Sequence, residues 1–84
     1  MAVILVVDDE IGIRELLSEI LSDEGYGVLL AENASAARSA MTQHPDLVLL
    51  DIWMPDNDGV SLLKEWNATG HPIFHLLLSV SYNP

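Results

Sequence analysis

Two short apolar runs, each ending in aspartate, constrain the fold of this chain more than any other feature. Residues 3–7 read VILVV and lead into Asp8 and Asp9. Residues 47–50 read LVLL and lead into Asp51. Asp51 by itself is also explained by a simple turn, because aspartate favours turns. The repetition of the pattern instead predicts two buried parallel strands, whose terminal carboxylates would meet at one edge of the sheet.

Helical and strand patterns alternate along the rest of the chain, which predicts a parallel α/β sheet with right-handed crossovers. Gly25 predicts the end of the first helix. Asn33 is expected to cap the second helix, which would run to Gln43 because Pro45 stops it. The expected strands are 3–7, 27–31, 47–51 and 73–80, and the expected helices begin at Asp9 or Glu10, after Asn33 and at Val60.

The spacing of apolar residues indicates which face of each helix turns inward. The first helix carries one continuous apolar stripe, whereas the second is rich in alanine and only thinly apolar. The expected inward residues are Ile13, Leu16, Leu17, Ile20 and Leu21 in the first helix, Ala37, Ala40 and Met41 in the second, and Val60, Leu63 and Trp66 in the third.

Three carboxylates crowded at a sheet edge repel one another, so either one of them keeps a proton or a cation joins them. Asp8, Asp9 and Asp51 offer the hard oxygen ligands that suit Mg²⁺. An aspartate beside a divalent cation can also act as a nucleophile toward a phosphoryl group. The sequence therefore predicts a magnesium site with phosphoryl chemistry at this edge.

Composition limits the class of protein. The 13 acidic and 3 basic residues give a formal net charge of −10, which argues against non-specific binding to nucleic acid or to an anionic membrane. The 84 residues allow one domain, and a hydrophobic content of 50% is too high for a disordered segment. Without cysteine the chain offers no disulfide or thiolate metal site. It has no signal peptide or membrane-length apolar run, and we expect a cytoplasmic protein.

ILVVDDE at 4–10 and DLVLLDIWMPDNDG at 46–59, at this spacing, resemble the receiver domain of two-component response regulators. The resemblance covers about residues 3–66, and the DIWMP and LLKEW wording looks most like receivers of the nitrogen-regulation (NtrC/NtrX) type. It implies a flavodoxin-like parallel sheet of strand order 2-1-3-4 and a signalling domain rather than an enzyme. Residues 1–84 would form a single partial receiver domain, with a divergent tail at 67–84.

The resemblance also assigns roles to individual residues. Asp51 matches the family's phosphoacceptor, which receives its phosphoryl group from a sensor histidine kinase. Asp8, Asp9 and Asp51, with the backbone carbonyl of Trp53, match the ligands of Mg²⁺. Ser79 is the best match for the hydroxyl residue that contacts the phosphoryl group, with Ser81 as the second candidate.

The end of the chain departs from the family. A complete receiver continues with a helix, a strand and a last helix, and the lysine that contacts the phosphoryl group lies on that strand. Lys64 does not replace this lysine because it falls in another element. We expect the apolar surface beside the first helix to be uncovered, the chain to form a homo-oligomer, and its phosphorylation-dependent output to be weak.

Two other functions are compatible with the sequence. A phosphatase of the haloacid-dehalogenase type also uses a strand-end aspartate with Mg²⁺, but it needs a second aspartate where this chain has Trp53. The shortened end also fits a non-catalytic interaction or dimerisation module that binds a kinase or a full-length regulator.

Overall fold

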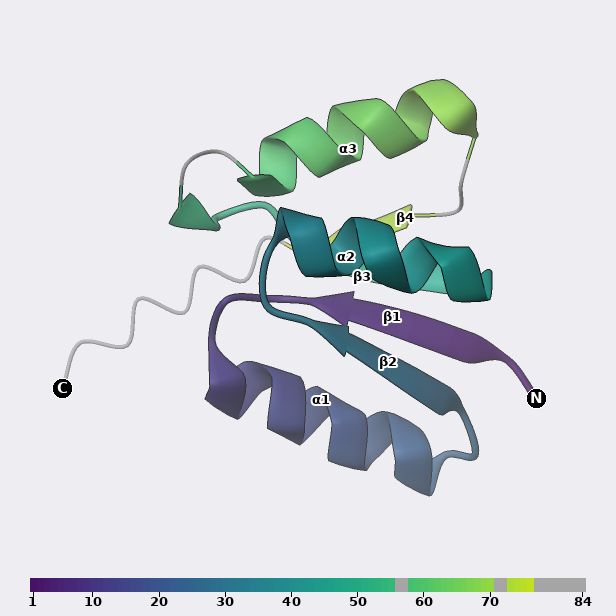
Figure 1. The fold of residues 1–84 in the computed structure, drawn as a ribbon. Coiled ribbons are helices and arrows are strands. Elements are labelled where there is room, and N and C mark those ends of the chain that lie inside the picture. The colour runs from purple at the N-terminus through teal and green to yellow at the C-terminus, as the bar shows by residue number, and fades with distance from the viewer. Residues whose placement is uncertain (56–57, 71–72, 77–84) are drawn as a thin grey trace, which may run out of the picture.

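The computed structural model describes residues 1–55, 58–70 and the backbone of 73–76. Its strands form one parallel sheet in the order β2-β1-β3-β4 (Figure 1). The strands are β1 (Val3–Val7), β2 (Gly27–Ala31), β3 (Leu47–Asp51) and β4 (Ile73–Leu76). The predicted α/β class, strand order and first three strands are confirmed.

Three α-helices and one 3₁₀ turn connect the strands: α1 (Ile11–Asp23), α2 (Ala34–Ala40), η1 (Met41–Gln43) and α3 (Asp58–Thr69). Right-handed crossovers from β1 to β2 and from β2 to β3 run in opposite directions across the sheet, so they place their helices on opposite faces. Figure 1 shows α1 beside β2, apart from α2 and α3. None of these helices is long and apolar enough to cross a membrane.

The register of the strands brings the two acidic strand ends to the same level. Val7, the last residue of β1, pairs with Leu50 of β3 and with Ala31 of β2. The residue after Val7 is Asp8 and the residue after Leu50 is Asp51, so β1 and β3 place their aspartates at the same level. This alignment fixes where the acidic residues gather.

The main core lies between the sheet and the two helices α2 and α3. Small residues of α2 let this helix approach the sheet closely, and Ala37 is completely buried. The strands contribute Leu5, Val7, Ala31, Val48 and Leu50, the helices contribute Ala34, Ala37, Leu62 and Trp66, and the loop after β3 adds Met54. Burial of this apolar surface is the main source of stability in a chain of this size.

Local hydrogen bonds define the helix ends that the sequence predicted. The Asn33 side chain accepts a hydrogen bond from the backbone N–H of Ala36 at 2.8 Å and so caps α2. At the end of α1, Gly25 adopts a left-handed φ of 90°. Its N–H donates to Ser22 O, and the N–H of Tyr26 donates to Leu21 O, which together form a Schellman motif.

The structure corrects two details of the later helices. The third helix extends over Asp58–Thr69 rather than 60–66, and Leu62 is its completely buried leucine, whereas Val60 and Leu63 are half-buried. The spacing of apolar residues does not show which of the adjacent Leu62 and Leu63 faces inward. Packing of the helix against the sheet determines this. The predicted last turn of the second helix is the separate 3₁₀ turn η1.

The apolar stripe of α1 is only partly inward, which also differs from the expectation. Ile13, Leu17 and Leu21 are half-buried, whereas Leu16 and Ile20 are 53% and 49% exposed. The helix contacts β2 and β1, so in the part of the chain that is described no element covers this side of it. Residues 77–80 of the expected fourth strand lie outside the described residues.

Candidate functional site

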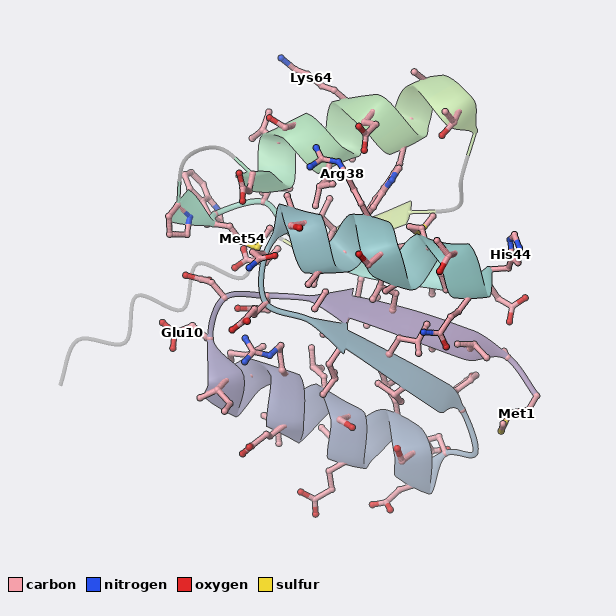
Figure 2. The ribbon with its side chains drawn as sticks, viewed as in Figure 1. Met1, Glu10, Arg38, His44, Met54 and Lys64 are labelled. Atoms are coloured by element: carbon pink, nitrogen blue, oxygen red, sulfur yellow. The ribbon has the colours of Figure 1, made fainter. Side chains whose placement is uncertain are left out.

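Three carboxylates converge at the end of the sheet where β1 and β3 finish. One oxygen from each of Asp8, Asp9 and Asp51 lies within 4.8 Å of the others. Asp8 and Asp51 are buried, with 3% and 7% exposed, whereas Asp9 is exposed to solvent. Figure 2 shows Glu10 and Met54, which flank this cluster in sequence, at the end of the molecule opposite Met1 and His44.

The turn between β1 and α1 positions Asp8. Its N–H continues the sheet by donating to Ala31 O at 3.1 Å, and its side-chain Oδ1 accepts the N–H of Glu10 at 2.9 Å. This side-chain bond closes a compact turn, and Glu10 then serves as the N-cap of α1. The Asp8 carbonyl accepts a hydrogen bond from Nη1 of Arg14 at 2.7 Å.

The loop after β3 positions Asp51 in the same way. The N–H of Trp53 donates to Asp51 Oδ1 at 2.9 Å, so the side chain is held by its own loop. Gly59, in the first turn of α3, packs directly against the backbone of Asp51 and Ile52. Among the described residues no hydrogen bond reaches the second carboxylate oxygen of Asp51, which leaves that oxygen open to a ligand.

The electrostatics of the cluster favour a proton or a cation. Burial raises the pKa of the Asp8 carboxyl from its ordinary value of 3.8 to about 6. The hydrogen bond from the Glu10 backbone lowers this pKa, and the nearby charges of Asp51, Asp9 and Glu10 raise it again. A buried carboxylate with like charges around it is stabilised when a cation enters, because the cation supplies the missing opposite charge.

The residues present fit a hard divalent cation. Carboxylate oxygens within 4.8 Å of one another are close enough for one six-coordinate cation to join them, directly or through its bound water. Mg²⁺ usually takes one or two carboxylates and keeps several waters, and the exposed Asp9 side leaves room for them. Within the described part of the chain, the cluster contains no histidine or cysteine ligand that would favour a softer metal.

The structure brings together Asp8, Asp9 and Asp51, as the sequence predicted, and places Trp53 next to them in the loop. The Trp53 side chain is 63% exposed, so it is not part of the core. Ser79 lies outside the described residues. Arg14 and the close packing of Gly59 were missed, although Arg14 follows the acidic turn by one helical turn and is one of only 3 basic residues.

Comparison with known proteins gives a consistent result. The family model of the response regulator receiver domain matches residues 4–83. Sporulation initiation phosphotransferase F of Bacillus subtilis is 48% identical over 77 residues, which cover 90% of this chain and 62% of that protein. The chain therefore spans less than two thirds of the length of this relative.

Solved structures are similar at the level of the fold as well as the sequence. The receiver domain of NtrX from Brucella abortus is 43% identical, with a TM-score of 0.78, over 86% of this chain and 64% of that chain. The crystal structure of the histidine kinase ThkA in complex with the response regulator protein TrrA contains a chain that is 40% identical, with a TM-score of 0.82, over 100% of this chain and 75% of that chain. The similarity to NtrX agrees with the resemblance to receivers of the nitrogen-regulation type.

Proposed function

The chain belongs to the response regulator receiver domain family, and on this premise we propose that Asp51 accepts a phosphoryl group from a phosphohistidine of a sensor histidine kinase. The observation that carries this proposal is the convergence of the Asp8, Asp9 and Asp51 carboxylates at one sheet edge. The kinase is the partner by analogy with TrrA, which forms a complex with the histidine kinase ThkA.

The chemistry that we propose uses the open oxygen of Asp51. This oxygen attacks the phosphorus, a new P–O bond forms, the P–N bond to the histidine breaks, and the imidazole nitrogen keeps the electron pair. The Trp53 N–H holds the other oxygen of Asp51 at 2.9 Å, so the carboxylate presents a fixed orientation to the incoming phosphorus.

Asp8, Asp9 and Asp51, with the Trp53 backbone carbonyl, are the residues that would hold Mg²⁺. When bound, Mg²⁺ offsets the negative charge on the transferring phosphoryl oxygens. Ser79 is proposed to contact the phosphoryl group, on sequence similarity alone. The domain acts in this proposal as a phosphorylated signalling partner, not as an enzyme that turns over a substrate.

Acetyl phosphate with Mg²⁺, followed by intact-mass measurement, tests the assignment of Asp51. We expect the mass of one phosphoryl group to be added to the wild-type chain and not to Asp51→Asn, while Asp23→Asn, at the exposed end of α1, is phosphorylated like the wild type. Phosphorylation of Asp51→Asn to the wild-type extent would contradict the assignment.

The same samples separate the two alternative functions. Steady release of phosphate from a phosphate monoester would indicate a phosphatase, although this chain has Trp53 where such enzymes need an aspartate. Absence of any reaction, combined with binding to a kinase or a regulator, would indicate an interaction module.

The remaining expectations are part of the same proposal. We place residues 1–84 in a single domain that works in the cytoplasm, where its kinase partner would present its phosphohistidine. The net charge of −10 disfavours direct contact of this segment with nucleic acid. The exposed apolar side of α1 favours association of the chain with itself.

A further inference from the structure

We propose that Arg14 is the positioning residue of the acidic turn, and that its side-chain hydrogen bond to the Asp8 carbonyl holds the turn in the conformation that brings the carboxylates together. Nη1 of Arg14 donates to this carbonyl at 2.7 Å, and the contact is partly buried. The inference deepens the proposed function, and it rests on that function only for its magnesium readout.

The backbone of this turn has few other attachments. The strand pairing ends at Val7, and beyond it the Asp8 N–H still bonds to Ala31 O. The Asp8 carbonyl has no other hydrogen-bond donor among the described residues. A guanidinium that donates to a partly buried carbonyl forms a charge-assisted bond, which is stronger than a bond between neutral groups.

Residue 14 contacts the turn at two points. Its backbone N–H donates to Glu10 O at 3.1 Å as the first bond of α1, while its side chain reaches back to Asp8 O. These two bonds span the segment that carries Asp8, Asp9 and Glu10. The segment is therefore fixed from the helix side by Arg14 and from the strand side by the Ala31 bond.

Two physical effects of Arg14 on cation binding have opposite signs. As a positive charge near the site, Arg14 repels a divalent cation, so its removal would strengthen Mg²⁺ binding. As the group that holds the turn, it preorganises two of the carboxylates, so its removal would weaken Mg²⁺ binding. The sign of the change therefore distinguishes a positioning residue from a nearby charge.

The test compares Arg14→Met, Arg14→Lys and the control Arg38→Met. Arg38 pairs with Glu65 between α2 and α3 at 3.2 Å, and its side chain is 50% exposed. Figure 2 shows Arg38 at α2 and α3, apart from the Glu10 end of α1. Both methionine variants remove one positive charge, so they change the net charge of the chain equally.

The first measurement is amide hydrogen exchange at Glu10, in the chain without metal. The Glu10 N–H bonds to Asp8 Oδ1, so its protection reports whether the turn is closed. We expect exchange to become roughly tenfold faster in Arg14→Met, to be partly restored in Arg14→Lys, and to be unchanged in Arg38→Met. Wild-type protection in Arg14→Met would overturn the proposal whatever the chain does with a metal.

The second measurement is a calorimetric titration with Mg²⁺. We expect roughly tenfold weaker binding by Arg14→Met, a smaller loss in Arg14→Lys, and wild-type binding by Arg38→Met. Unchanged or tighter Mg²⁺ binding by Arg14→Met would contradict the positioning role and would show that Arg14 acts only as a nearby charge. A wild-type chain that does not bind Mg²⁺ would instead contradict the proposed function, while the exchange measurement would still decide the role of Arg14.

Discussion

Asp8 shows how strongly the site depends on single residues. It is buried beside two other carboxylates, and this burial raises its pKa to about 6. In the range between its ordinary pKa of 3.8 and this value, the folded chain binds a proton more tightly than the unfolded chain. The contribution of Asp8 to folding stability is therefore most favourable at low pH and is lost as the pH rises through about 6.

Asp8→Asn should remove this pH dependence. The asparagine oxygen can still accept the Glu10 N–H, but it carries no charge to bury. Without metal, we expect the variant to be more stable than the wild type by about 1–2 kcal/mol near pH 7, after allowance for solvent screening, and by much less near pH 4.5. Urea unfolding across this pH range measures the difference. A constant difference between the two chains would contradict the assigned titration of Asp8.

Gly59 is a second residue on which the site depends, because it leaves no room for a side chain. A Cβ there would lie 2.9 Å from the carbonyl carbon of Ile52 and closer still to Ile52 Cα and Asp51 O. These are backbone atoms, so they can move only together with the loop that holds Asp51.

Gly59→Ala is expected to destabilise the chain by about 1–3 kcal/mol and to weaken Mg²⁺ binding, because it displaces the Asp51 backbone. Gly12→Ala is the matched control, since Gly12 also lies in a helix but a Cβ there would meet no atom of a neighbouring described residue within 4 Å. We expect that control to be neutral or more stable by up to about 1 kcal/mol. Thermal unfolding and calorimetry measure both effects, and equal behaviour of the two variants would contradict the packing argument.

At the scale of elements, the strands were predictable and the helix faces were less so. Apolar runs bounded by turn residues predicted the limits of β1, β2 and β3 correctly. Burial on both faces explains the continuous apolar signal of β1 and β3, whereas β2 lies at the edge of the sheet and leaves Leu30 exposed. Spacing alone did not distinguish Leu62 from Leu63, and it did not reveal that Leu16 and Ile20 stay exposed, because both depend on which neighbours cover a helix. The convergence of the aspartates was predictable from strand ends, whereas the Arg14 bond depends on side-chain direction.

The connection between η1 and β3 contains a strained residue that the sequence did not reveal. His44 adopts a left-handed φ of 53° as the chain leaves η1. A residue with a side chain is disfavoured there by roughly 1–2 kcal/mol.

His44→Gly should therefore stabilise the chain by about 0.5–1 kcal/mol, after the entropy cost of glycine. Gln43→Gly, one position earlier and inside η1, should destabilise it instead. Chemical denaturation of the two variants makes the comparison, and a loss of stability in His44→Gly would show that the imidazole contributes more than the strain costs.

At the scale of the whole molecule, an apolar surface and a large negative charge oppose each other. Leu16 and Ile20 are exposed on α1, and the exposed acids Glu15 and Glu19 lie beside them on the same helix. Association of two copies through this side would bury apolar surface but would also bring like charges together.

We expect the 84-residue chain to self-associate at tens of micromolar, and to do so more strongly as salt screens the repulsion. The double variant Leu16→Lys with Ile20→Lys should be mainly monomeric. Ser35→Lys with Ser39→Lys, two exposed positions on α2, makes the same change in charge and should associate at least as strongly as the wild type. Sedimentation velocity measures all three, and a monomeric wild type at high salt would contradict the expectation.

The two tryptophans of the chain have opposite surroundings, because Trp53 is 63% exposed next to Asp51 and Trp66 is only 4% exposed in the core. The protein thus carries a pair of built-in optical probes. Acrylamide should quench the emission of Trp53 and leave that of Trp66 largely untouched. In a Trp66→Phe chain, the fluorescence of Trp53 would then report changes near the Asp8, Asp9 and Asp51 carboxylates. In a Trp53→Phe chain, the fluorescence of Trp66 would report only the unfolding of the core.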